Sequence, residues 1–338
     1  MNFQNDYSLK KINTFGINVS AKYFIEVFTE SEILEIVSDK RFSGENKFIL
    51  GGGSNVLFTK NFDGLVIKNS VQGIKITDED RNSVSVQAGA GVVWNELVSY
   101  AVERNYGGIE NLALIPGNVG AAPIQNIGAY GQELADSFES LSGIMLNDGT
   151  RITFLKSDCK FSYRDSIFKH ELKDKFIITS VKIRLLKNPK VNLTYKQVSD
   201  EIHTSGINNP TIRDVSDLIS KLRRIKLPYP DEIGNAGSFF KNPVIPVEKF
   251  TELEKKYPDI ITFDIDTNHK KIAAGWLIEK CGWKGKRIGN VGTHEKHALV
   301  VVNHGNATGD EVLEFADRIV ESVEMKFRIH LENEVNII

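Results

Sequence analysis

Cysteine is scarce in this sequence: Cys159 and Cys281 are the only two among 338 residues, and they form no CxxC pair. This scarcity excludes a disulfide scaffold and a cysteine-based zinc cluster, and it fits a reduced compartment. His294 and His297 have a spacing compatible with metal ligation, but no suitable carboxylate or cysteine accompanies them. We therefore expect no metal site.

The sequence also lacks an excess of either charge. It contains 42 lysines and arginines against 44 aspartates and glutamates, which gives a formal net charge of −2. A nucleic-acid-binding protein typically has a basic patch, often with aromatic residues between the cations, and no long stretch of that kind is present. We do not expect nucleic acid as a partner.

No apolar run is suited to a membrane span, which needs about 20 residues of unbroken helix. The longest run without charge lies between Glu110 and Glu133, but Pro116, Pro123 and four glycines interrupt it. Residues 1–6 lack the basic and apolar regions of a signal peptide. We expect a cytoplasmic protein without membrane association.

The residues that are present, 41% hydrophobic and 25% charged, are typical of a soluble globular protein. The length predicts two or three domains, with boundaries near residue 67 and within the polar segment 199–214. Strands and helices alternate without a strict βαβα order, which favours an α+β fold over a Rossmann sheet. Strands are expected at 48–50, 84–88, 181–185, 299–302 and 329–338, and helices at 29–37, 94–101, 214–225, 273–281 and 308–323.

Residues 51–55, Gly-Gly-Gly-Ser-Asn, lie between two apolar segments. Successive glycines let backbone N–H groups converge on an anion such as a diphosphate. The run is not a Walker A motif, and the apolar residues after it resemble a strand rather than a helix. A tight connection between strands is the alternative.

Residues 114–131 form a long segment without charge that is rich in glycine and alanine. Such a loop would expose much apolar area unless it packed against something. Its small side chains favour a flat, bulky partner such as a flavin ring. A well-packed structural loop is the alternative.

The third segment, 234–243, places the hydroxyl of Ser238 after small residues and before two phenylalanines, Lys241 and Asn242. Small residues admit a ligand, aromatic residues fix rotamers, and polar groups orient the ligand. A tight turn with an aromatic anchor is the alternative.

The two glycine-rich loops resemble those of the vanillyl-alcohol-oxidase or PCMH-type FAD-binding domains. With four further segments in the same order, the chain resembles the UDP-N-acetylenolpyruvoylglucosamine reductases, the MurB family, in its tyrosine-bearing type I. The matching segments are 13–16, 51–58, 114–131, 161–166, 234–243 and 331–335.

The resemblance implies an α+β protein with a two-lobed PCMH-type FAD-binding fold and a separate α+β substrate-binding domain. Residues 1–66 with 326–338 would form the first lobe, 67–213 the second, and 214–325 the substrate domain. FAD would be bound non-covalently, because the glycine loops hold no histidine or cysteine that resembles an attachment site. We expect a monomer.

The activity implied is reduction of a nucleotide sugar in peptidoglycan precursor synthesis. NADPH would reduce FAD, which would pass hydride to the enolpyruvyl double bond of UDP-N-acetylenolpyruvoylglucosamine, and UDP-N-acetylmuramate would form. This chemistry needs a hydride donor, a group that stabilises the developing enolate, and a proton donor.

By resemblance, the catalytic residues are Ser238 as proton donor, with Arg164 and Glu334. Serine is a weak acid, so chemistry alone would favour a turn or capping role for Ser238. The guanidinium of Arg164 suits a carboxylate or an enolate, although a salt bridge to a nearby acid is the alternative. Glu334 would otherwise lie on the solvated face of a strand.

The cofactor residues implied are Gly51, Gly52, Gly53, Ser54, Asn55, Pro116, Gly117, Gly120, Ala121, Ala122, Ile127, Gly128, Tyr130 and Gly131. The substrate residues implied are Tyr195, Lys226, Asn242, Lys284 and His297. His297 stands where the better-known type I members carry a glutamine that helps hold the nucleotide. The charge of a histidine depends on pH, so we expect the nucleotide affinity to vary near neutral pH.

Two other functions stay open. One is a different flavin oxidoreductase of the same superfamily, against which the joint presence of Ser238, Arg164 and Glu334 argues. The other is a non-catalytic flavoprotein that binds nucleotide sugars without consuming NADPH.

Overall fold

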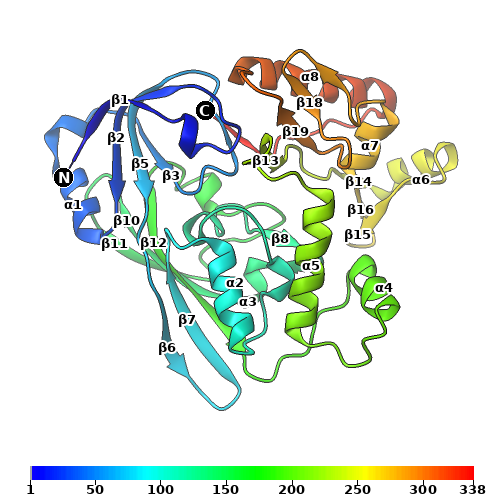
Figure 1. Ribbon diagram of the computed structural model, residues 1–338, viewed down its shortest axis with the longest axis horizontal. Coiled ribbons are helices and arrows are strands. Elements are labelled where there is room, and N and C mark those ends of the chain that lie inside the picture. Colours follow the sequence, from blue (N-terminus) through cyan, green and yellow to red (C-terminus); the bar gives the residue numbers. More distant parts are fainter. Residues whose placement is uncertain (1) are drawn as a thin grey trace. The chain divides into compact units, whose positions relative to one another are not determined.

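The computed structural model describes residues 2–338 (Figure 1). The chain divides into two compact units. Unit 1 contains residues 2–7, Ala21–Gly52 and Phe62–Ile225, and unit 2 contains Ser8–Ser20, Gly53–Asn61 and Lys226–Ile338. The finer division into two lobes and a substrate domain stays a prediction. None of the helices within residues 2–338 is long and apolar enough to cross a membrane.

Unit 1 begins with a four-stranded sheet in the order β1 (Gln4–Ser8), β2 (Ser20–Val27), β5 (Phe62–Asn69) and β3 (Lys47–Leu50). β2 and β3 both pair parallel with β5. Helix α1 (Glu30–Ser38) starts at the expected capping box, in which Thr29 Oγ1 accepts from the Glu32 amide at 3.2 Å. Its Ile33 and Ile36 are buried in a core with Ile67 of β5.

The second sheet of unit 1 is antiparallel, in the order β11 (Arg151–Leu155), β10 (Phe138–Met145), β12 (Phe176–Leu186), β7 (Ser83–Gly89) and β6 (Ile74–Glu79). The amphipathic helices α2 (Trp94–Glu103) and α5 (Ile212–Lys226) contribute to a core of the unit. There, Trp94 and Ile219 belong to the same cluster as Val86 and Ile183 of the sheet. The predicted strands at 48–50, 84–88 and 181–185 are confirmed as β3, β7 and part of β12.

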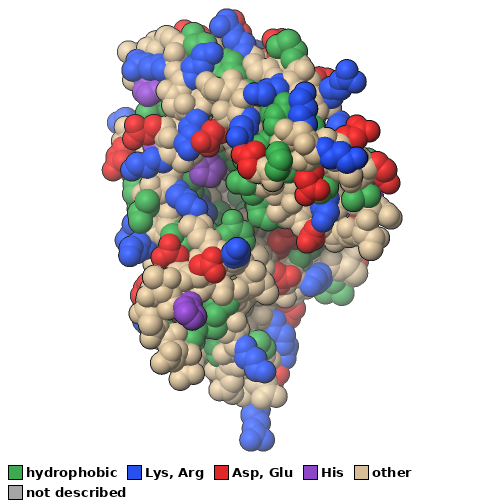
Figure 2. All heavy atoms as spheres, turned by 90° about the vertical axis from the view of Figure 1, so that its right-hand side faces the viewer, with side chains coloured by type: hydrophobic (Ala, Val, Ile, Leu, Met, Phe, Trp, Pro, Cys, Tyr) green, Lys and Arg blue, Asp and Glu red, His purple; other side chains and the backbone are tan. Residues whose placement is uncertain are grey.

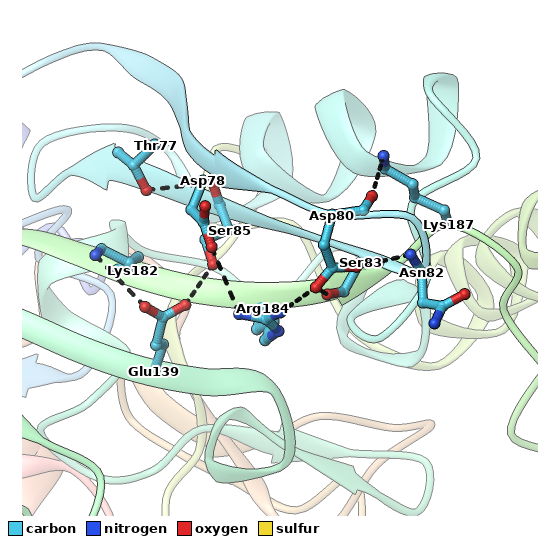
Figure 3. A network of polar contacts seen from close by, with 10 residues as sticks. All are labelled: Thr77, Asp78, Asp80, Asn82, Ser83, Ser85, Glu139, Lys182, Arg184 and Lys187. Atoms are coloured by element: carbon cyan, nitrogen blue, oxygen red, sulfur yellow. Dashed lines mark hydrogen bonds and ion pairs between the residues drawn. The ribbon is translucent and has the colours of Figure 1, made fainter.

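The hairpin of β6 and β7 carries a network of polar side chains, shown in Figure 3. Arg184 of β12 pairs with Asp80 at 2.5 Å, and the Asp80 carboxylate accepts from the amides of Asn82 and Ser83 at 2.7 and 2.8 Å. These backbone bonds and the bond from the Ser83 hydroxyl lower the pKa of Asp80 to about 2, with a smaller contribution from the Arg184 charge. The network fixes the turn of the hairpin.

The remaining elements of unit 1 are short. They are α3 (Leu134–Ser137), α4 (Lys196–Thr204), the β8 (Gly128–Ala129) and β9 (Gln132–Glu133) pair, and the 3₁₀ turns Lys40–Phe42, Glu110–Leu112, Val119–Ala121 and Ile167–Lys169.

Unit 2 contains three small sheets. The first has the strand order β13 (Gly234–Ser238), β19 (Val300–Asn303), β18 (Val291–Thr293) and β17 (Arg287–Ile288). The second has the order β14 (Val244–Pro246), β16 (His269–Ile272) and β15 (Thr262–Asp264). The third pairs β20 (Asn336–Ile337) with β4 (Val56–Leu57). The other elements are α6 (Val247–Lys256), α7 (Ala274–Lys280), α8 (Gly309–Phe327) and the 3₁₀ turn Lys10–Ile12. The capping box expected at Thr308 and Glu311 starts α8.

The prediction of one strand over 329–338 is wrong. Only Asn336 and Ile337 form a strand, which pairs parallel with β4. Residues 329–335 form no regular strand. Asn333 forms a single bridge with Phe240, and Ile329, Leu331 and Val335 are buried. The alternating pattern reflects burial against unit 2 rather than membership of a regular sheet.

Acidic and basic side chains are interspersed on the face of the molecule shown in Figure 2. Neither sign gathers into one patch there, as expected from the nearly balanced charges.

Candidate active site

Ser238 lies at the end of β13, directly after a β-bulge. β13 pairs with β19 through Asn235 opposite Val302 and Ser238 opposite Val300, and the register shifts between these pairs. Within the bulge Gly237 has φ of +72°, and its amide donates to Asn235 Oδ1 at 2.9 Å. Bulges redirect the side chains that follow them and recur near active sites.

Glu334 lies beside the Ser238 segment in unit 2. Its amide donates to the carbonyl of Phe239 at 2.8 Å, and Asn333 forms a bridge with Phe240. The carbonyl of Glu334 accepts from Asn55 Nδ2 at 3.2 Å. The structure therefore brings together two predicted catalytic residues and one predicted cofactor residue that are far apart in sequence.

Residues 13–16 hold this arrangement, a role that the sequence reasoning missed. The amide of Thr14 donates to the carbonyl of Gly53 at 3.0 Å, and its carbonyl accepts from the amide of Asn235 at 3.0 Å. A Cβ on Gly53 would lie 2.1 Å from the carbonyl oxygen of Ile12. Close packing against the backbone of Ile12 therefore requires glycine at position 53, independently of any role in binding a cofactor.

The two glycine-rich loops meet in unit 1. A Cβ on Gly52 would lie 2.8 Å from Asn118 Oδ1 and 3.1 Å from the Cα of Gly117, and one on Gly51 would touch Ala121. The amides of Gly51 and Gly52 donate no hydrogen bond within the described part of unit 1. Small residues and available N–H groups fit a diphosphate with an attached planar ring.

Some of the predicted cofactor residues have structural reasons for their identity. A Cβ on Gly120 would lie 2.5 Å from the Cβ of Ala90, and Ala122 is only 1% exposed. These two positions pack the loop onto the protein interior. They therefore place the backbone of the loop.

Arg164 lies against the same loop in unit 1. Its Nη2 donates to the carbonyl of Gly128, and a Cβ on Gly128 would lie 2.8 Å from Arg164 Nη1. The guanidinium is 5.4 Å from the ring centroid of Tyr163. Glycine at 128 therefore makes room for the arginine.

Tyr130 and Tyr195 pack edge to face in unit 1, with ring centroids 5.4 Å apart. Burial raises the pKa of each phenol, so both stay protonated near neutral pH and can donate hydrogen bonds. The buried side chain of Asn111 links their segments, because its Nδ2 donates to the carbonyls of Tyr130 at 2.9 Å and Asn192 at 3.0 Å.

The remaining predicted substrate residues are spread over unit 2. Asn242 Oδ1 accepts from the amide of Ala274 at 2.9 Å, at the start of α7. Lys284 forms an ion pair with Glu279 at 3.0 Å, and Lys226 ends α5. The amide of His297 donates to the carbonyl of His294 at 3.3 Å, in the connection between β18 and β19.

Two family models match the chain. Residues 21–154 match an FAD-binding domain, and residues 228–338 match the C-terminal domain of UDP-N-acetylenolpyruvoylglucosamine reductase. The chain also resembles a solved UDP-N-acetylenolpyruvylglucosamine reductase (MurB) from Thermus caldophilus, with a TM-score of 0.66 and 24% identity over 99% of this chain and 98% of that one. This likeness shows a shared fold.

Curated relatives match over their whole length. The UDP-N-acetylenolpyruvoylglucosamine reductase of Flavobacterium johnsoniae is 46% identical over 100% of both chains. Those of Amoebophilus asiaticus and Pseudomonas aeruginosa are 45% and 44% identical, again over 100% of this chain and 100% and 99% of theirs.

Proposed function

This chain belongs to the UDP-N-acetylenolpyruvoylglucosamine reductase family, and from that membership we propose that it reduces UDP-N-acetylenolpyruvoylglucosamine to UDP-N-acetylmuramate with electrons from NADPH. The observation that carries the proposal is 46% identity to a curated reductase over the full length of both chains. The reaction is an FAD-dependent step of peptidoglycan precursor synthesis.

FAD, when bound, accepts hydride from NADPH and supplies hydride to the methylene carbon of the enolpyruvyl group. We propose that the residues named by resemblance hold it: Gly51, Gly52, Gly53, Ser54, Asn55, Pro116, Gly117, Gly120, Ala121, Ala122, Ile127, Gly128, Tyr130 and Gly131. The N–H groups of Gly51 and Gly52 suit its diphosphate. No covalent link to the chain is proposed.

Ser238 donates the proton that completes the saturated carbon next to the carboxylate. Arg164 binds that carboxylate and stabilises the extra negative charge that develops on it as the enolate forms. Glu334 completes the catalytic group. Its backbone contact with Phe239, the residue after Ser238, supports a shared role for the two residues.

The nucleotide portion of the substrate is assigned to Tyr195, Lys226, Asn242, Lys284 and His297. The lysines would face the diphosphate, for which cations and N–H donors are the natural partners. Tyr195 suits the same role because its phenol stays protonated and can donate a hydrogen bond.

The wider setting is proposed on the same basis. Both NADPH and UDP-sugars are cytoplasmic metabolites, so we place the protein in the cytoplasm, as a monomer. In the proposed domain division, residues 1–66 together with 326–338 form the first FAD-binding lobe, and residues 67–213 form the second. Residues 214–325 form the substrate domain.

An anaerobic cycle tests the function. The purified protein is expected to be yellow, to lose its flavin absorbance on addition of NADPH, and to regain it when UDP-N-acetylenolpyruvoylglucosamine follows. Product is identified by its mass. If excess substrate leaves the reduced flavin unchanged, the chain is another flavin oxidoreductase or a binding protein, and the proposal is wrong.

A further inference from the structure

Arg223 of α5 is a cation without a negative partner in unit 1. Its Nε donates to the carbonyl of Leu114 at 3.1 Å. Within residues 2–338 the structure gives its Nη groups no acceptor and its charge no carboxylate. A guanidinium has five N–H donors, so the end of this side chain keeps donors available for a ligand.

The side chain is enclosed by protein yet still reached by solvent. Residue 223 is partly buried, and desolvation lowers the pKa of its guanidinium. Arginine does not lose its proton under such conditions, so the protein carries the cost of a poorly hydrated charge. That cost falls when an anion binds.

A second cation increases this cost. Arg164 is close enough that its positive charge lowers the pKa of Arg223 further. Tyr130 is also nearby, but burial raises the pKa of its phenol, so it stays neutral and does not balance the charge of Arg223.

The position of Arg223 is fixed by the backbone. Leu114 has φ of +55°, and its amide donates to Asn95 Oδ1 of α2 at 2.8 Å. The carbonyl that receives Arg223 Nε is therefore held by a constrained residue. A guanidinium anchored at Nε presents its two Nη groups in one direction, as bidentate recognition of a carboxylate requires.

We propose that Arg223 is a further substrate-binding residue, which binds the carboxylate of the enolpyruvyl group together with Arg164. The inference rests on the proposed function, because Arg164 is the residue assigned to that carboxylate. Two guanidinium groups around one carboxylate can each take one oxygen, and both interactions strengthen when the enolate gains charge.

Two ligands that differ in this carboxylate test the proposal. UDP-N-acetylmuramate carries the carboxylate, whereas UDP-N-acetylglucosamine has the same nucleotide and sugar without it. Their affinities for the FAD-loaded protein are measured by calorimetry for the wild type, Arg223→Met, Arg223→Lys and Arg224→Met. Arg224 is the next residue of α5 and is exposed. Arg224→Met removes the same charge as Arg223→Met and is therefore the control.

Arg223→Met is expected to weaken binding of UDP-N-acetylmuramate by about 10- to 100-fold, the effect of losing a charged hydrogen bond. Binding of UDP-N-acetylglucosamine, FAD content and the rate of flavin reduction by NADPH are expected to be unchanged. Arg223→Lys should lie between wild type and Arg223→Met, and Arg224→Met should match wild type.

Unchanged affinity for UDP-N-acetylmuramate would overturn the inference. So would an equal loss for both ligands, which indicates diphosphate binding or a structural role, and so would loss of FAD. If Arg223→Met does not fold, Arg223→Lys decides by the same criterion. The wild-type flavin cycle tests the proposed function separately, so a failure of one is distinguished from a failure of the other.

Discussion

The side-chain oxygen of Asn235 accepts a hydrogen bond from the backbone amide of Gly237 at 2.9 Å. This bond closes the bulge that precedes Ser238, where Gly237 has φ of +72°. No atom lies within 4 Å of a Cβ built on Gly237. A larger residue would therefore strain the backbone without a steric clash, and the strain would act on the position of Ser238.

Gly237→Ala is expected to lower the free energy of unfolding by about 1–2 kcal/mol, the cost of a left-handed conformation for a residue with Cβ. It is also expected to lower kcat, because the bulge sets the direction of Ser238. Denaturant unfolding and NADPH oxidation measure the two effects.

Gly305→Ala is the matched control. Gly305 has φ of +114°, and its amide donates to Asn303 Oδ1 at 2.9 Å in an equivalent turn of unit 2. The kcat of Gly305→Ala should stay near that of the wild type despite an equal or larger loss of stability, because φ of +114° lies outside the left-handed region that alanine can adopt. Equal losses of kcat in both variants would contradict the role given to the bulge.

Ser238→Ala is expected to retain FAD and to be reduced by NADPH at the normal rate. Reoxidation by the enolpyruvyl substrate should slow by about 10²- to 10⁴-fold, the usual contribution of a general acid. Rapid-mixing absorbance separates the two half-reactions. Ser322→Ala is the control, because the Ser322 hydroxyl donates to the carbonyl of Arg318 in its own helix α8. Full-rate reoxidation in Ser238→Ala would remove Ser238 from the mechanism.

Asn111→Ala is expected to destabilise unit 1 by about 1–3 kcal/mol, because two carbonyls lose their donor in a buried place. The freed segments carry Tyr130 and Tyr195, so the KM for the nucleotide-sugar substrate should rise as well. Thermal unfolding and steady-state kinetics measure these changes. Asn208→Ala, in an exposed loop, should change neither. A normal KM in Asn111→Ala would show that the link is purely structural.

Cys159 gives the protein a defined response to alkaline pH. Its thiol is 0% exposed, and burial raises its pKa from 9.0 to about 12. The unfolded chain releases this proton first, so the stabilisation is complete below pH 9 and is lost as the pH rises toward 12.

Over that range the free energy of unfolding should fall by up to about 1.4 kcal/mol per pH unit through this thiol alone. The difference between wild type and Cys159→Ala isolates the effect from other titrating groups. The same slope in wild type and Cys159→Ala would contradict the assignment.

Local signals predicted much of the fold. The capping boxes at Thr29 and Thr308 mark helix starts because their bonds form within a few residues. The glycine loops could also be identified locally. Their small residues indicate that the backbone lies close to a ligand or to another segment of the chain. Residues 329–335 were predicted to be part of a strand because apolar and polar positions alternate there. Only Asn333 among them pairs, in a single bridge with Phe240.

Other parts of the site depend on partners distant in sequence. The bulge before Ser238 exists only through pairing with β19, and the charge of Arg223 looks ordinary until its surroundings are known. The serine itself was assigned from resemblance, since a weakly acidic hydroxyl gives no chemical signal. Neither hydrophobic periodicity nor spacing contains this information.

The pairing of β4 with β20 has a consequence for synthesis on the ribosome. Thr59 bonds to the carbonyl of Ile338, which lies 279 residues later. At about 5–20 residues per second, the earlier segment waits on the order of 15–60 s for its partner to be translated. During that interval its edge is open to strands of other nascent chains.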